Sequence, residues 1–110
     1  MGILERKERE REMRRQEIIL AAKRVFSKKG FNKSTMDDIA SEAELSNGTL
    51  YHYFKNKKEL YASLSLRILH DFCFRVEFIN KESDLTPEQK VEKMIEAMNE
   101  NNKMSMSLTR

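Results

Sequence analysis

The amino-acid sequence predicts an all-α protein, and three observations lead to this prediction. Apolar side chains recur at helical spacing, and no segment shows the alternation of polar and apolar residues that is typical of a strand. A single proline and three glycines argue against both a β-sandwich and a disordered chain. Side chains that commonly cap helix N-termini precede several of the apolar segments. With 39% hydrophobic residues, the chain of 110 residues has enough apolar material for a helical core.

The first predicted helix spans residues 5–29, and its beginning is charged. Residues 5–17 are almost wholly charged, which is typical of a solvated helix surface. We therefore expect residues 1–13 to form a charged helical extension. A DNA-contacting arm is the alternative for this segment. The side chains that support this alternative are Arg11, Arg14 and Arg15.

The second part of this helix has one apolar face, and a glycine marks its end. The residues that line this face at helical spacing are Ile18, Ala22, Val25 and Phe26. Gly30 can adopt the left-handed backbone conformation that commonly ends a helix, and Phe31 is then placed to pack back on Phe26.

Four further helices are predicted from capping patterns. Three pairs have the spacing of a capping box, namely Thr35 with Asp38, Asn56 with Glu59, and Thr86 with Gln89. Ser46 is a natural N-cap for a helix that begins one residue later. We expect these helices at 36–43, 47–54, 57–80 and 87–103.

The two short helices, 36–43 and 47–54, are separated by a tight turn, which is the arrangement of a helix-turn-helix. Leu50 and Phe54 are four residues apart and are expected to pack inward on the preceding helix. The second helix of such a motif lies in the DNA major groove, where its N-terminal residues contact base edges. The pattern therefore predicts binding to double-stranded DNA.

The residues around the rest of the second short helix suit contacts with DNA. Asn47 carries an amide that can pair with an adenine edge, and Thr49 can offer a hydroxyl or a methyl group. Gly48 has no Cβ, so a DNA backbone can approach it closely. The remaining candidates combine a ring with a polar tip, and they are Tyr51, His52 and Tyr53.

Phosphate contacts are expected on either side of these residues. The helix N-termini at Thr35 and at Asn56-Lys57 attract anions, and Lys55, Lys57 and Lys58 add mobile positive charge. Residues 1–60 contain 14 Lys and Arg and 10 Asp and Glu, a net charge of +4, whereas residues 61–110 contain 7 and 8, a net charge of −1. The basic surplus therefore falls in the half that contains the helix-turn-helix, as a surface that faces phosphates requires.

Residues 14–65 resemble the DNA-binding domain of a tetracycline-repressor (TetR) family regulator. The resemblance lies in Gly30-Phe31, in the segment from Ser34 to Ala43, and above all in the run Gly-Thr-Leu-Tyr-x-Tyr-Phe-x-Asn-Lys at residues 48–57. By position, the resemblance implies DNA contacts from Thr35, Asn47, Gly48, Thr49, Tyr51, His52, Tyr53 and Lys57. Ser46 and Lys55 complete the set of predicted DNA-contacting residues.

The resemblance also implies an architecture and a mode of regulation. A three-helix DNA-binding domain at residues 1–56 would be followed, at residues 57–110, by a linking helix and the start of a helical ligand-binding and dimerisation domain. The protein would be a repressor that binds an inverted-repeat operator as a homodimer and is released by a small-molecule effector. Such regulators continue well past residue 110, so we expect the chain to be truncated and to respond to an effector only when the remaining domain is present. Glu44 stands where the family usually has glycine, at a backbone cost of about 1 kcal/mol.

The C-terminal half is apolar on most sides of one helix, and such a helix needs cover on most sides. The helix at 87–103 can supply part of this cover with its own apolar stripe. Additional helices, a second copy of the chain or an apolar ligand would supply the rest. We expect the isolated chain to associate through this surface.

Other classes of function find little support. No phosphate-binding loop, dinucleotide fingerprint or zinc-protease motif occurs, so we expect neither an enzyme nor a cofactor. His70 and Cys73 alone make a poor metal site, and Cys73 is interpreted as a core residue. A single cysteine and the lack of a membrane span or signal peptide predict a cytoplasmic protein without membrane contact. A helical protein–protein interaction module without specific DNA binding stays open as the alternative function.

Overall fold

The computed structural model describes the backbone of residues 2–108 and the side chains of residues 2–104. It contains five helices and, within these residues, no strand, which confirms the predicted all-α class. The helices are α1 (Ile3–Lys29), α2 (Met36–Glu42), α3 (Asn47–Tyr53), α4 (Lys57–Lys81) and α5 (Pro87–Leu108). The first four lie within two residues of the predicted bounds, whereas α5 continues to Leu108 instead of ending at residue 103.

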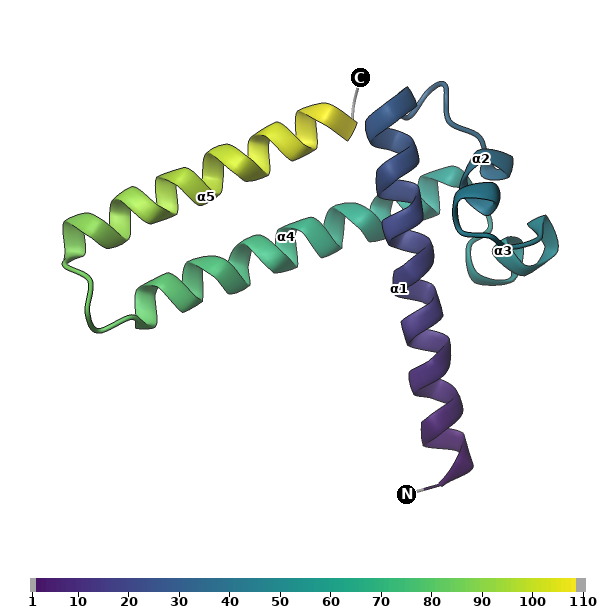
Figure 1. The fold of residues 1–110 in the computed structure, drawn as a ribbon, viewed down its shortest axis with the longest axis horizontal. Coiled ribbons are helices and arrows are strands. Elements are labelled where there is room, and N and C mark those ends of the chain that lie inside the picture. The colour runs from purple at the N-terminus through teal and green to yellow at the C-terminus, as the bar shows by residue number, and fades with distance from the viewer. Residues whose placement is uncertain (1, 109–110) are drawn as a thin grey trace.

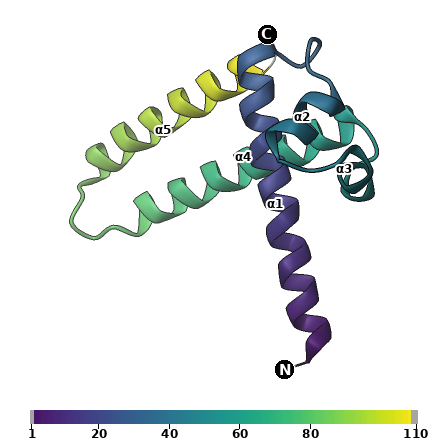
Figure 2. The same cartoon turned by 45° about the vertical axis from the view of Figure 1, so that its right-hand side comes forward.

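The helices form a flat, crossed arrangement whose principal extents are 51, 44 and 18 Å. In Figure 1, α1 runs vertically across α4, with α2 and α3 on one side of it and the α4–α5 hairpin projecting to the other. The C-terminal end of α5 returns to the C-terminal end of α1, and the N-terminal half of α1 extends beyond all other helices; Figure 2 shows both features from a second direction.

One apolar core joins α1, α2, α3 and the first two turns of α4. Its buried residues are Ile18, Ile19, Ala22, Val25, Phe26, Met36, Ile39, Ala40, Leu50, Phe54, Leu60 and Leu64. Phe31 and Tyr61 close one side of the core, with ring centroids 5.6 and 5.9 Å from that of Phe26. The predicted packing of Phe31 on Phe26 is confirmed. The first two turns of α4 are therefore part of the same packed unit as α2 and α3.

Side-chain caps fix where the helices begin. Thr35 forms the predicted capping box with Asp38, and Thr86 forms one with Gln89. The third predicted box differs by one residue. Asn56 Oδ1 accepts the Glu59 N–H at 2.8 Å, but the Glu59 carboxylate accepts the N–H of Lys55 and not that of Asn56.

Gly30 ends α1 in a backbone conformation that residues with a side chain rarely adopt. Its φ is 80° and its ψ is 162°, and its N–H donates to the Phe26 carbonyl oxygen at 2.8 Å. The positive φ agrees with the prediction, although ψ is extended and not left-handed helical. The extended ψ turns the chain directly away from α1 and into the loop that leads to α2.

The α4–α5 hairpin leaves much of its apolar surface uncovered. Leu66 is 68% exposed and Phe74 is 63% exposed on α4, while Val91 is 54% exposed on α5. The interpretation of Cys73 as a core residue is wrong: its side chain is exposed, as are those of Leu69 and Phe78 on the same helix. Between residues 2 and 108, no helix combines the length and apolarity that crossing a membrane would require.

Candidate nucleic-acid interface

The α3 helix separates cleanly into a buried face and an outer face. Leu50 is 0% exposed and Phe54 is 1% exposed, and both belong to the same core as Ile39 and Ala40 of α2. The predicted inward packing of Leu50 and Phe54 is thus confirmed. The helix consequently turns its other residues outward. Those that are exposed are Ser46, Asn47, Gly48, Tyr51 and His52, and those that are half-buried are Thr49 and Tyr53.

The N-terminus of α3 is held by three polar contacts. Ser46 Oγ accepts the Thr49 N–H at 3.2 Å and lies 2.9 Å from Thr49 Oγ1. Asn47 Nδ2 donates to Asp37 Oδ1 of α2 at 2.6 Å. An asparagine that reads adenine uses the same amide nitrogen as a donor. That nitrogen carries two hydrogens, so Asn47 can keep its bond to Asp37 and still offer one N–H and its carbonyl oxygen to an adenine edge.

Gly48 lies at the open surface of α3. A Cβ built at this position meets no atom within 4 Å, so nothing inside the chain requires glycine here. A glycine inside a helix normally costs stability relative to alanine. Its place on the outer face of α3 is therefore suited to close approach by another molecule.

The three ring-bearing candidates of α3 do not have equal access. The Tyr51 side chain is 48% exposed, and His52 is also exposed. Tyr53 instead packs partly on the core, and its ring lies perpendicular to that of His52 at a centroid distance of 5.7 Å. Tyr51 and His52 can reach a ligand directly, whereas Tyr53 reaches it from the rim of α3.

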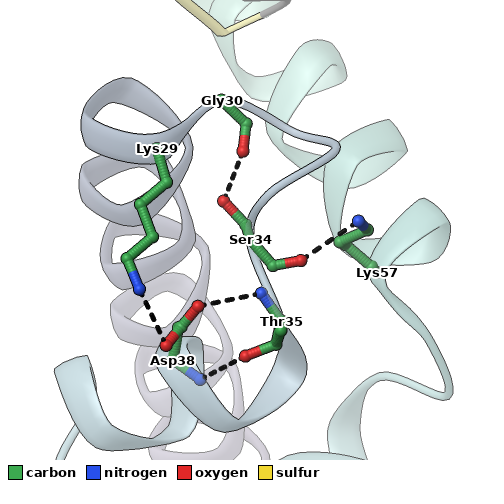
Figure 3. Close-up of polar contacts among 6 residues, drawn as sticks. All are labelled: Lys29, Gly30, Ser34, Thr35, Asp38 and Lys57. Atoms are coloured by element: carbon green, nitrogen blue, oxygen red, sulfur yellow. Dashed lines mark hydrogen bonds and ion pairs between the residues drawn. The ribbon is translucent and has the colours of Figure 1, made fainter.

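Lys57, at the start of α4, is turned inward. Its ammonium donates to the carbonyl oxygens of Phe31 and Ser34 at 2.7 and 3.1 Å and lies 4.3 Å from the centroid of the Phe31 ring. Figure 3 shows the Lys57 ammonium pointing at the loop between α1 and α2. The expectation that Lys57 adds mobile charge is wrong, because two loop carbonyls hold its ammonium. Lys55 and Lys58 are exposed, as expected.

The same loop is fastened to α2 by contacts that sequence reasoning only partly found (Figure 3). Thr35 Oγ1 accepts the Asp38 N–H at 3.0 Å, and the Thr35 N–H donates to Asp38 Oδ2 at 3.1 Å. Lys29 Nζ lies 3.1 Å from Asp38 Oδ1, and the buried Ser34 hydroxyl donates to the Gly30 carbonyl at 2.5 Å. The bond from Lys29, followed by those from Thr35, lowers the pKa of the Asp38 carboxyl below its ordinary value. The Lys29–Asp38 pair follows no local spacing rule, whereas the Ser34–Gly30 bond spans only four residues and was missed although its spacing is local.

Glu44 occupies the turn between α2 and α3 with a φ of 59°. The left-handed region is costly for a residue with a side chain, by roughly 1–2 kcal/mol, and the prediction of strain at this position is confirmed. The turn keeps its backbone bonds nonetheless. The N–H of Glu44 donates to the Ser41 carbonyl at 3.1 Å, and that of Leu45 donates to the Ala40 carbonyl at 2.9 Å.

Two arginines that sequence reasoning did not assign to this role connect α1 with α4. Arg15 Nη2 donates to Ser63 Oγ at 3.2 Å, and its guanidinium carbon lies 5.3 Å from the centroid of the Phe54 ring. Arg67 of α4 donates to the Gln16 side chain of α1. Arg15 is thus directed at α4, and the structure does not place it in a DNA-contacting arm.

The described part of the chain contains no group of three or more His, Cys, Asp and Glu side chains that could hold a metal ion. Most of the predicted DNA-contacting residues, in contrast, lie on the outer face of α3, whose start is bonded to the first turn of α2 through Asn47 and Asp37, whereas Lys57 turns inward.

Comparison with protein families identifies the same region. Residues 18–64 match the family described as "Bacterial regulatory proteins, tetR family". The HTH-type transcriptional regulator TtgR of Pseudomonas putida is 37% identical over 84 residues, which cover 74% of this chain and 40% of TtgR. The fatty acid metabolism regulator protein of Bacillus subtilis is 36% identical over 73 residues, which cover 66% of this chain and 38% of that protein.

The fold is also found among solved structures. A chain named as a fatty acid metabolism regulator of Clostridium perfringens has a TM-score of 0.65 and 35% sequence identity, over 83% of this chain and 53% of its own. The present chain therefore spans about two fifths of these curated relatives and about half of that solved chain.

Proposed function

Since the chain is a member of the tetR family of bacterial regulatory proteins, as its sequence predicted, we propose that it binds double-stranded DNA sequence-specifically and regulates transcription. The observation that carries this proposal is the outer face of α3. Leu50 and Phe54 hold the helix on the core, and an amide, a glycine and a hydroxyl follow one another at its exposed start. Groups of this kind read base edges in the major groove.

We assign different roles to the residues of this interface. Asn47, Thr49, Tyr51 and His52 contact base edges, and Gly48 allows the backbone to approach. The contacts that position the protein on phosphates come from Thr35, Ser46, Tyr53, Lys55 and the N-terminal turn of α4, where Lys57 lies. The Lys57 ammonium orients the α1–α2 loop, since it is already bonded to two loop carbonyls. Phosphate contacts fix orientation and carry no sequence information directly.

We further propose that the complete regulator is a cytoplasmic repressor. It would bind an inverted repeat as a homodimer, with half-sites about one helical turn apart or somewhat more. Residues 1–56 would form the DNA-binding domain, and residues 57–110 would begin the part that dimerises and binds a small-molecule effector. The packing of Leu60 and Leu64 with the helix-turn-helix supports a role for α4 in transmitting effector binding, because a shift of α4 must move this core.

The salt dependence of DNA binding tests the proposal. The affinity of the chain for duplex DNA should fall steeply as salt rises, with a slope of log K against log salt of about −0.9 for each phosphate contact. A flat salt dependence, or no binding to duplex DNA at low salt, would contradict the proposal and favour the helical protein–protein module. None of the relatives described above carries a name that supports that module.

A further inference from the structure

The N-terminal half of α1 is a separate structural feature. Residues 3–17 continue the helix beyond the core, and at about 1.5 Å per residue they add about 22 Å to it. In Figures 1 and 2 this segment extends past α2 and α3 without lying against another helix. Its side chains up to residue 14 are exposed, so packing does not explain its composition.

One face of this extension carries a basic stripe, which consists of Lys7, Arg11 and Arg14. These residues are spaced at i, i+4 and i+7, so they lie in one row along the helix. Further along, the same row reaches Ile18 and Val25, which are buried in the core. The basic stripe is therefore the continuation of the face that α1 turns toward the other helices of the DNA-binding domain.

The basic stripe and α3 line the same groove. An open groove of about 460 Å³ is lined by all three residues of the basic stripe and by Tyr53 of α3. The rest of its lining consists of Glu10, Met13 and Glu17. The stripe and the rim of α3 are thus parts of one surface.

Some charged side chains of the extension form ion pairs within the helix, and others do not. Arg6 pairs with Glu10 at 3.5 Å, and Arg15 pairs with Glu12 at 3.6 Å. Among the described side chains, no ion pair involves a residue of the basic stripe. Three cations therefore face the groove against two carboxylates, and Arg6 already offsets one of those, Glu10.

We propose that the basic stripe binds the phosphate backbone of the duplex beside the segment that α3 reads. This inference rests on the proposed function of α3. The stripe spans about 10 Å along the helix axis, and duplex DNA carries one negative charge per about 1.7 Å of its axis, so long basic side chains in a row can reach several phosphates. Because phosphates carry no sequence information, the stripe adds affinity and register without changing the preferred sequence.

Arg9 provides a matched control on the same helix. It is two residues from Arg11, it is exposed, and it lies on the opposite face. Arg11→Gln and Arg9→Gln remove the same charge and keep a residue of good helix propensity. Circular dichroism of both variants should show the same helical content as the unmodified chain.

The test is the salt dependence of binding to random-sequence duplex DNA. Arg11→Gln should reduce the magnitude of the slope of log K against log salt by about 0.9, and Arg11→Gln with Arg14→Gln should reduce it by about 1.8. Arg9→Gln should leave the slope nearly unchanged. If Arg9→Gln and Arg11→Gln reduced the slope equally, while the binding of the unmodified chain still depended steeply on salt, the proposed role of the stripe would be wrong. The proposed function of α3 would not be affected by this result. No salt-dependent binding by the unmodified chain would overturn both.

Hydroxyl-radical footprinting on a bound duplex gives a second, positional test. The unmodified chain should protect backbone positions beyond the segment that α3 contacts, and the variant with both Arg11 and Arg14 replaced by Gln should lose protection only there. Uniform loss of protection over the whole site would contradict a local contact. Identical protection by this variant and by the unmodified chain would also contradict contact between the stripe and DNA. That result would indicate that the stripe binds an acidic partner other than DNA.

Discussion

The two ends of α4 lie in contrasting surroundings. Its first two turns are closed in by α1, α2 and α3, and Leu60 and Leu64 are fully buried there. Beyond them, α4 pairs with α5, and side chains such as Leu66 and Phe74 stay largely exposed. One helix thus begins in a complete core and continues into an incomplete one. The contrast teaches that the region of the helix-turn-helix has its packing within these residues, while the hairpin keeps an uncovered apolar surface.

Leucine replacements in the closed core and on the exposed part of α4 should differ most. Leu50→Ala removes a fully buried side chain from the closed core and should lower the free energy of unfolding by about 2–5 kcal/mol. Leu69→Ala, at a position on α4 that is 54% exposed, should change it by less than about 0.5 kcal/mol. Urea unfolding of both variants measures the difference. Similar losses would show that the hairpin is as tightly packed as the core.

Lys57 connects the closed end of α4 with the α1–α2 loop. Lys57→Met keeps the length of the side chain but leaves the Phe31 and Ser34 carbonyls without their donor, which should cost about 1–3 kcal/mol of stability. DNA affinity should fall while the salt slope stays the same, because the ammonium acts on the loop.

Lys58→Met, which changes an exposed neighbour, is the control for this experiment. It should leave stability unchanged. If Lys57→Met instead keeps full stability and lowers the salt slope by about 0.9, the ammonium contacts phosphate and the assignment to the loop is wrong.

Gly48→Ala separates folding from DNA contact within α3. A Cβ at this position meets no atom of the chain, so the replacement should raise stability by about 0.5–1 kcal/mol through better helix propensity. Affinity for the preferred duplex should nevertheless decrease, because the new methyl group lies where DNA approaches. Titration of labelled duplex measures this, and undiminished affinity would place DNA away from Gly48.

The smallest effect concerns Asp38 and depends on pH. The bonds from Lys29 and Thr35 lower its pKa in the folded chain, so its ionised form stabilises the fold above the unfolded value of about 3.9. This contribution is lost as the pH falls through the folded pKa. Asp38→Asn should therefore be less stable than the unmodified chain at pH 7, and the difference should shrink below about pH 4. Thermal unfolding of both proteins across this pH range measures the difference in stability. A difference that did not change with pH would contradict a stabilising role of the ionised Asp38.

Local rules were sufficient for most of the fold. The caps at Thr35, Ser46 and Thr86 and the inward pair Leu50 and Phe54 follow from spacings of three or four residues, and the structure confirms them. The family resemblance arose above all from a run of ten residues, 48–57, which also lies within one helix and its flanks. Such features can be predicted because each depends on neighbours in the sequence.

Most of the contacts that were missed join residues far apart in the chain. The Lys57 ammonium bonds to a carbonyl 26 residues away, and Arg15 reaches Ser63 over 48 residues. No periodicity encodes such pairs, because they depend on how the helices cross. Cys73 was misplaced for a related reason: its apolar neighbours indicate burial, but whether it is buried depends on which helices cover α4.

Selection of random duplex DNA by the unmodified chain and by Thr49→Ala, at fixed moderate salt, examines the reading function of α3 most directly. We predict that the unmodified chain enriches an inverted repeat and that Thr49→Ala relaxes the preference at one position of each half-site, by about 1–3 kcal/mol. Enrichment of the same sequences with the same stringency by both proteins would contradict a base-reading role for this face of α3. No enrichment by either protein, together with a flat salt dependence of binding, would contradict DNA recognition by this chain altogether.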